Sequence, residues 1–184
     1  MLGFEKNTLR RTLMVVAAIG PLALAATGTA LAASTTATAT IKLANGNDAG
    51  TVTFTAGTAG VLLKFDLKGL PPGPHAVHVY ETGKCEGNFD SAGRIYNPLG
   101  AGHGFLADEG PMAGDLPNIH AGADGAVVAE ILSPFFTLST ESDDNLFDAD
   151  GTALVVLENA DDYETDPDGG GGARIGCGVI TPAK

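Results

Sequence analysis

Tryptophan is absent from the 184-residue sequence, and aromatic residues make up only 6% of it. Hydrophobic residues still reach 44%, so we expect a core built mainly from Val, Leu, Ile, Ala and a few Phe. The period of an amphipathic helix is also missing. The 26 Gly and 10 Pro residues divide the chain into short segments, which is typical of all-β proteins, and the length favours one domain.

Positive charge is scarce. The chain has 10 Lys and Arg residues against 22 Asp and Glu, for a formal net charge of -12. Loss of the first 32 residues would remove Lys6, Arg10, Arg11 and Glu5 and bring this charge to -14. So acidic a protein is expected to repel nucleic acid and anionic membrane surfaces, and we exclude both as partners.

The first 32 residues have the composition of an export signal. Basic residues precede an apolar run over residues 12–31, and small residues at 30–32 supply a cleavage site. We predict a signal peptide at 1–32, one domain at 33–184 and a periplasmic or secreted protein with no membrane attachment after cleavage. A retained anchor is the alternative, disfavoured by the Gly20-Pro21 break. The Arg10-Arg11 pair keeps twin-arginine export as an alternative to the general secretory route, which is favoured.

Cysteine occurs only twice, as Cys85 and Cys177. In an exported chain the two are expected to form a disulfide. That bond would close a loop of about 92 residues, worth roughly 4–5 kcal/mol in the chain-entropy model. Two free buried thiols are the alternative.

Short segments of alternating or β-branched residues predict about eight strands. Asn45-Gly46 is a hairpin signal, and two long loops follow the fourth and seventh strands, near residues 81–124 and 159–172. The predicted strands are residues 38–43, 51–56, 61–67, 75–80, 126–132, 135–138, 152–157 and 173–180.

Several short motifs in the sequence are collinear with those of a known family. They are GPHAVHV at 73–79, GKCE at 83–86, SAG at 91–93, NPL at 97–99, HG at 103–104, GPMAGDLPN at 110–118, NADD at 159–162, GGGGAR at 169–174 and CGVI at 177–180. In this order they resemble the copper/zinc superoxide dismutases, in particular the bacterial periplasmic branch. The resemblance implies an eight-stranded Greek-key β-barrel with two long loops and a Cys85–Cys177 disulfide.

The metal ligands are the point at which the resemblance fails. The family holds copper with four histidines, one of them shared with zinc, and holds zinc with two further histidines and an aspartate. By position, His78 falls on a copper ligand, and His103 and Asp115 fall on zinc ligands. The other four of the seven positions carry Tyr80, Ile95, Met112 and Leu157.

Two further residues match positions outside the ligand set. Asp161 falls on an aspartate that links a copper histidine to a zinc histidine, which implies a His78–Asp161–His103 bridge. Arg174 falls on the arginine that draws superoxide to copper. The plainer interpretation makes Arg174 a partner for a loop carboxylate or carbonyl.

Coordination chemistry limits what these residues can bind. Isoleucine and leucine coordinate no metal, and tyrosine does so only as a phenolate, whose ordinary pKa is near 10. His103 and Asp115 alone leave zinc two ligands short of its usual four. We therefore expect no cofactor. His75, Glu81, Met112 and His120 form no spacing that demands another site, and we expect His75 to be structural and Met112 to pack in the loop.

Three functions compete. The favoured hypothesis is an exported superoxide-dismutase-like barrel whose copper and zinc sites are dismantled, and which binds an unknown protein or small ligand or has a structural role. The alternative is a superoxide dismutase with a rearranged or copper-only site, which would restore copper and zinc as cofactors. A copper-buffering protein is disfavoured because no Met/His cluster or Cys-x-x-Cys motif occurs. Formation of a homodimer is a further possibility that the sequence leaves undecided.

Overall fold

The computed structural model describes residues 35–183, which fall in one compact unit of the chain. The predicted signal peptide, residues 1–32, lies outside the described residues. Within 35–183 there are nine strands, one 3-10 turn and no α-helix, so no helix in this range could span a membrane. The elements are β1 (Thr36–Leu43), β2 (Asp48–Gly57), β3 (Gly60–Leu67), β4 (Gly73–His75), β5 (Val77–Tyr80), η1 (Asp90–Ala92), β6 (Ile119–Ala121), β7 (Val127–Ser133), β8 (Ala153–Leu157) and β9 (Arg174–Pro182).

Period-two alternation accounts for the long strands. In β1, Ala37, Ala39 and Ile41 are fully buried, whereas the residues between them are partly or fully exposed. Strand β3 repeats the pattern from Val61 to Leu67. By contrast β8, ALVVL, is buried at every residue, because both of its faces are covered.

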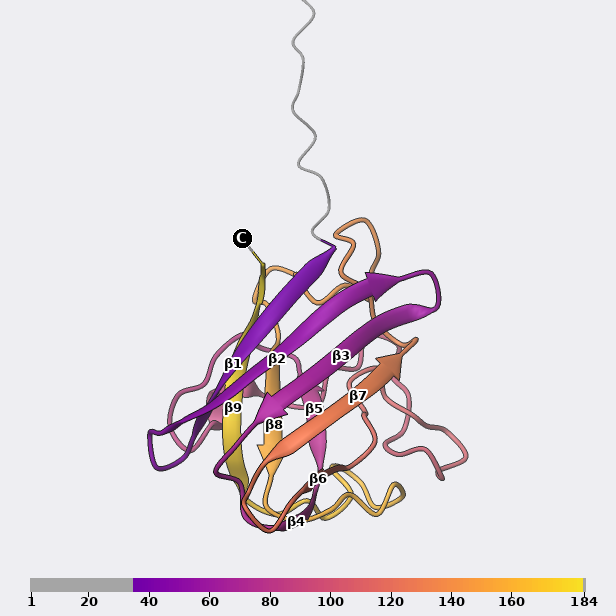
Figure 1. Ribbon diagram of the computed structural model, residues 1–184. Coiled ribbons are helices and arrows are strands. Elements are labelled where there is room, and N and C mark those ends of the chain that lie inside the picture. The colour runs from indigo at the N-terminus through magenta and orange to yellow at the C-terminus, as the bar shows by residue number, and fades with distance from the viewer. Residues whose placement is uncertain (1–34, 184) are drawn as a thin grey trace, which may run out of the picture. The chain divides into compact units, whose positions relative to one another are not determined.

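The strands curl into an antiparallel barrel. Seven pair in the order β5-β8-β9-β1-β2-β3-β7, and β4 pairs with β6 (Figure 1). Strands β4 and β5 form one run broken at Ala76, whose N–H donates to the carbonyl of Asn159 (2.7 Å). A tight turn at 122–126 joins β6 to β7, which brings the two ends of the sheet together. With β4 and β5 counted as one strand, the barrel has the predicted eight strands.

One strand prediction was wrong, and one strand was missed. Residues 135–138 form no strand, although Phe136 and Leu138 are buried; they are apolar because they pack on the core, and Thr137 makes only an isolated bridge to Asn145. Strand β6 at Ile119–Ala121 was missed, because three residues after a Gly-rich loop carry too short a pattern to detect.

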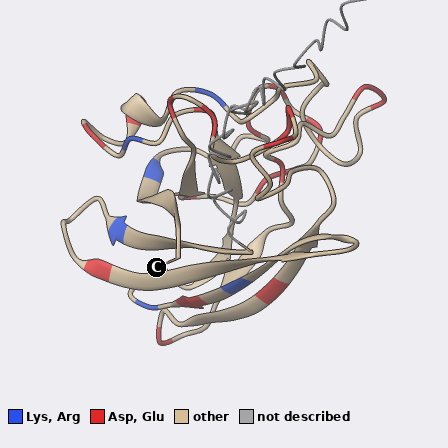
Figure 2. Ribbon diagram, turned by 90° about the horizontal axis from the view of Figure 1, so that it is seen from above, with Lys and Arg blue, Asp and Glu red and all other residues tan. Residues whose placement is uncertain are grey.

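The predicted disulfide is present and joins Cys85, in the long loop, to Cys177 on β9. It therefore ties the loop that follows β5 to β9, the second strand from β5 in the sheet. The loops carry most of the acidic residues, and Figure 2 shows Asp and Glu far outnumbering Lys and Arg along them.

Candidate functional site

The long loop folds back over β5 and brings an aspartate to a strand histidine. The N–H of Val79 donates to the carbonyl of Gly114 (2.9 Å). A side chain at Gly114 would collide with the Val79 carbonyl, so glycine permits this close approach. As a result Asp115 lies opposite His78 in an isolated β-bridge, and both side chains are fully buried.

His103 is held between two buried carboxylates. Its Nδ1 lies 2.9 Å from Oδ1 of Asp115 and its Nε2 lies 3.1 Å from Oδ1 of Asp161. Two carboxylate acceptors require both ring nitrogens to donate, which is the protonated imidazolium. Burial opposes this charge, but the two hydrogen bonds outweigh it and raise the pKa of His103 to about 10. Burial likewise opposes ionisation of Asp161, yet the hydrogen bonds from His103 and from the Tyr163 N–H, together with the charges of the two histidines, outweigh it and lower the pKa of this carboxyl.

His78 is buried in the same cluster without a hydrogen bond. Its Nδ1 lies 3.6 Å from Oδ1 of Asp115, and its Nε2 lies 3.6 Å from Oδ2 of Asp161, both too long for hydrogen bonds. Within the described part of the chain neither ring nitrogen has a partner. Burial lowers the pKa of His78 to about 4, only partly offset by the two carboxylates. The expected His78–Asp161–His103 bridge thus has its hydrogen bond on the His103 side alone.

Backbone N–H groups hold the carboxylate of Asp115, and an asparagine side chain holds the backbone of Asp161. Oδ2 of Asp115 accepts hydrogen bonds from the N–H of Gly104 (2.8 Å) and of Met112 (2.9 Å). The N–H of Asp161 donates to Oδ1 of Asn118 (2.8 Å), and Nδ2 of Asn118 donates to the Asp161 carbonyl (2.9 Å). Sequence analysis did not assign this role to Asn118; its place at the end of the 110–118 motif was the one available signal.

From the pKa shifts of His78 and His103 we predict that the protein is most stable near pH 6.5. Since the folded pKa of His103, about 10, lies above its ordinary value of 6.5, its contribution to stability is complete below about pH 6.5 and is lost towards pH 10. The folded pKa of His78, about 4, lies below 6.5, so its contribution is lost as the pH falls from 6.5 towards 4. The urea midpoint, measured across this range, should pass through a maximum.

The substitution His103→Gln provides the control for this pH dependence. The variant should keep the acidic decline that His78 causes and lose the alkaline one. A wild-type urea midpoint that stays constant from neutral pH to about pH 9 would contradict a protonated His103 in the folded protein.

Three of the four residues predicted to replace metal ligands lie in one apolar cluster beside the ionic one. Tyr80, Ile95 and Leu157 are all buried and belong to the same group of packed side chains. Tyr80 and Ile95 face each other in an isolated β-bridge. Met112, at the fourth position, is partly buried and packs against this cluster.

Arg174 contacts carbonyls and a ring. Its Nη1 donates to the carbonyl of Phe89 and its Nη2 to that of Gly93, both at 2.7 Å. The guanidinium carbon lies 4.4 Å from the centre of the Tyr80 ring, within cation–π range. Burial raises the pKa of Tyr80 to about 12, an effect that Arg174 only partly offsets. The carbonyl alternative for Arg174 therefore matches the structure.

The other histidines lie outside the cluster. His75 is buried, with Nδ1 2.9 Å from the Leu157 carbonyl oxygen and Nε2 2.7 Å from that of Pro71. His120 is exposed on β6. Glu81 accepts a hydrogen bond from the N–H of Arg94 (3.1 Å). Among residues 35–183 no group of three or more His, Cys, Asp or Glu side chains is arranged to hold a metal ion.

An antiparallel barrel with buried imidazoles and carboxylates, contributed by β5 and by the loops at residues 81–118 and 158–173, is the architecture of a protein of the dismutase type. The family model for copper/zinc superoxide dismutase (SODC) matches residues 48–180. The chain therefore belongs to the copper/zinc superoxide dismutase family.

Relatives in this family carry two kinds of name. A superoxide dismutase [Cu-Zn] of Caulobacter vibrioides is 50% identical over 147 residues, covering 78% of this chain and 84% of that protein. The superoxide dismutase-like protein YojM of Bacillus subtilis is 43% identical over 123 residues, covering 66% of this chain and 63% of that protein. The crystal structure of a SOD-like protein from Bacillus subtilis superposes with a TM-score of 0.74 at 38% identity, covering 77% of this chain and 96% of that one.

Proposed function

We propose that this protein is a member of the superoxide dismutase family that does not dismutate superoxide and acts as a binding or structural protein. One observation carries the proposal: Tyr80, Ile95 and Leu157, which stand at three of the family's four copper-ligand positions, pack together in a buried apolar cluster. Only His78 keeps an imidazole among those positions. The residues present do not fit a copper centre.

The chemistry of each replacement supports this proposal. Dismutation needs a copper ion that changes oxidation state and keeps a position open for superoxide, and imidazoles suit both states. The side chains of Ile95 and Leu157 have no donor atom. Tyr80 would have to lose a proton from a phenol whose pKa burial has raised to about 12. Arg174, the family's anion-guiding position, already donates to two carbonyls.

A location outside the cytoplasm forms part of the proposal. The Cys85–Cys177 disulfide supports it, because such bonds persist in oxidising compartments. One relative, 33% identical over 154 residues, is named an extracellular superoxide dismutase, from Brugia pahangi. The export signal predicted at residues 1–32 agrees with this placement.

A dismutase with a rearranged metal site is the competing function. The 50% identity to the Caulobacter vibrioides superoxide dismutase favours it, as does the survival of His78, His103, Asp115 and Asp161 in one buried cluster. Such an enzyme would have to coordinate its metal through His78 and His103, because these are the two imidazoles of the cluster. Loss of activity on their replacement would distinguish it from the proposal.

Superoxide decay tests the two functions directly. Superoxide dismutase is among the enzymes that work near the diffusional ceiling, about 10⁸–10⁹ M⁻¹ s⁻¹. After incubation with copper and zinc and removal of free metal, the protein should accelerate decay no more than its metal-free form does. The Caulobacter vibrioides relative, treated identically, is the positive control. A rate constant that approaches that of the relative, and falls in the His78→Ala variant, would establish the competing function.

A further inference from the structure

The barrel has an unpaired seam between β6 and β7. These are the end strands of the two sheets, and a hydrogen bond from the Gly122 N–H to the Ala126 carbonyl (2.9 Å) closes the turn between them. Beyond that turn no backbone hydrogen bond joins the described residues of β6 to those of β7. A groove of about 460 Å³ lies there, lined by residues 117–120 and 128–132. Its volume lies within the range of ligand-binding clefts.

The walls of this groove present unpaired backbone groups. The carbonyl of Ala126 points to β6, and successive residues of a strand direct their backbone groups to opposite sides. No bulge interrupts the pairing of β7 with β3, so Val128, Glu130 and Leu132 direct their N–H and C=O groups into the groove. Such a row of free donors and acceptors is a template for one more strand.

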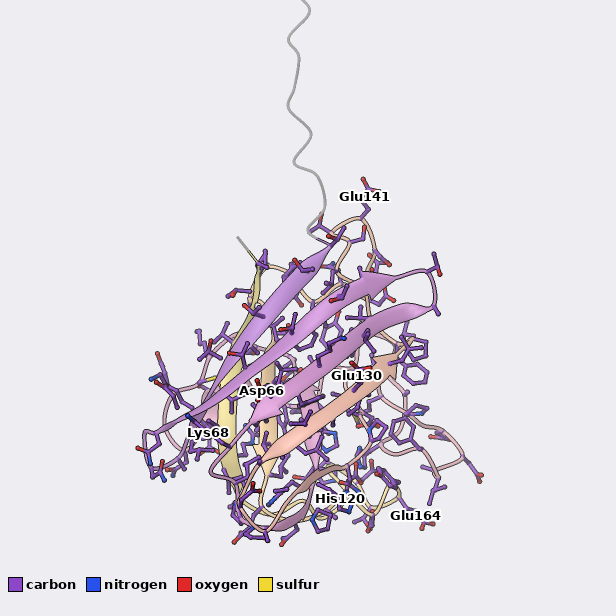
Figure 3. The ribbon with its side chains drawn as sticks, viewed as in Figure 1. Asp66, Lys68, His120, Glu130, Glu141 and Glu164 are labelled. Carbon is purple, nitrogen blue, oxygen red and sulfur yellow. A yellow bond between two sulfur atoms is a disulfide. The ribbon has the colours of Figure 1, made fainter. Side chains whose placement is uncertain are left out.

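Side chains along the groove alternate in character. Val128 and Leu132 are exposed to 87% and 54%, which is high for aliphatic residues in a strand, and Glu130 lies between them on the same outer face. Ala129 and Ile131 point to the core yet remain only partly buried. Figure 3 shows Glu130 on β7 and His120 below it. An added strand would therefore meet apolar residues on its inner side and apolar–acidic–apolar residues on its outer side.

Charge determines which kind of strand fits. Glu130 contacts Lys64 at 2.8 Å, but both side chains are more than half exposed, so the carboxylate can accept a second cation. Asp66 lies on the neighbouring strand, in register with Val128. A second copy of this chain would bring another net charge of -12 and its own Glu130 to the groove, which like-charge repulsion disfavours.

We propose that the β6–β7 groove binds an extended segment of another polypeptide, in which apolar residues alternate with Lys or Arg, as an added β-strand. Backbone hydrogen bonds to Val128, Glu130 and Leu132 supply the affinity, and a basic side chain opposite Glu130 supplies selectivity. The proposal gives the binding role proposed above a surface and a partner chemistry. Binding at the groove requires no metal. A failure to bind peptide would therefore leave the superoxide result unchanged, and dismutase activity would leave the peptide result unchanged.

Synthetic peptides test this groove in the full disulfide-bonded protein. The probe is a fluorescent seven-residue peptide of alternating Val and Lys with blocked ends, and the control peptide carries Glu in place of Lys. We expect saturable binding of the Val–Lys peptide alone. Glu130→Lys should weaken it about tenfold, because an opposite-charge cross-strand pair becomes a like-charge one. Glu141→Lys, an equal charge change in a loop distant from the groove (Figure 3), should change the affinity less than about twofold.

Proline and hydrogen exchange test the backbone contacts. Glu130→Pro removes a donor that faces the groove and leaves the bonds to β3 intact, and it should weaken binding about tenfold. Peptide should slow hydrogen exchange at Val128, Glu130 and Leu132 and leave Ala129 and Ile131 unchanged, because the latter already bond to β3. Two binding results would each overturn the proposal: the Val–Lys peptide fails to bind, or Glu141→Lys weakens its binding as much as Glu130→Lys does. Two results on the free protein would do the same: the groove amides already exchange slowly without peptide, or a second copy of the chain occupies the groove.

Discussion

The substitution Asp161→Ala is expected to lower the free energy of unfolding by about 3–5 kcal/mol, the cost of removing one partner from a buried ion pair. Asp161 accepts a hydrogen bond from His103 and lies 3.6 Å from His78, and its side chain is fully buried. Its loss would leave His103 with a single carboxylate and remove the acceptor of the Tyr163 N–H. Urea denaturation with an unchanged m-value would give the difference.

Two substitutions control for charge and shape. Asp161→Asn keeps the side-chain volume and one carbonyl acceptor, so its loss should be smaller than that of alanine, about 1–3 kcal/mol. Asp66→Ala removes an exposed carboxylate from β3 and should change stability by no more than about 0.5 kcal/mol. If Asp161→Ala cost no more than Asp66→Ala, the buried cluster would not be a structural unit.

Replacing both cysteines, Cys85→Ala with Cys177→Ala, is expected to cost about 4–5 kcal/mol in the chain-entropy description of cross-links. The two residues lie 92 apart in sequence, and the bond holds the long loop against β9. Arg174 bonds to Phe89 and Gly93 in the same loop and should keep it in place once folded. The expected result is therefore a native barrel with a lower urea midpoint.

Reducing agent supplies the matched control for the cysteine variant. It should shift the urea midpoint of the wild type to that of the double variant and leave the variant unchanged. A loss below about 1 kcal/mol would mean that the 92-residue cross-link constrains the unfolded chain far less than loop-closure entropy predicts.

Regular strands could be read from the sequence because one face of each is buried. The alternation in residues 38–43 and 61–67 is a local property, and it identified β1 and β3 within two residues of their ends. Residues 135–138 were misassigned because apolar residues that pin a loop to the core resemble a short strand. Strand β6 was missed because its pairing with β4 depends on contacts between segments 44 to 48 residues apart.

The candidate site was predictable in composition and not in contacts. Position in the motifs identified His78, His103, Asp115 and Asp161, and the structure places all four in one buried cluster. That Asp115 lies between both histidines depends on how the long loop folds over β5, which no local pattern encodes. The stacking of Arg174 on Tyr80 likewise joins residues 94 apart in the sequence, and no local pattern in either segment indicates the contact.

Metal content tests the central claim most directly. The disulfide-bonded protein is incubated with excess copper and zinc, freed of unbound metal, and assayed for both ions per chain, with the Caulobacter vibrioides relative as the positive control. Because Ile95 and Leu157 offer no donor atom and His103 and Asp115 leave zinc two ligands short of four, we predict far less than one ion of either metal per chain. Retention of about one copper ion per chain, abolished by His78→Ala, would contradict the account.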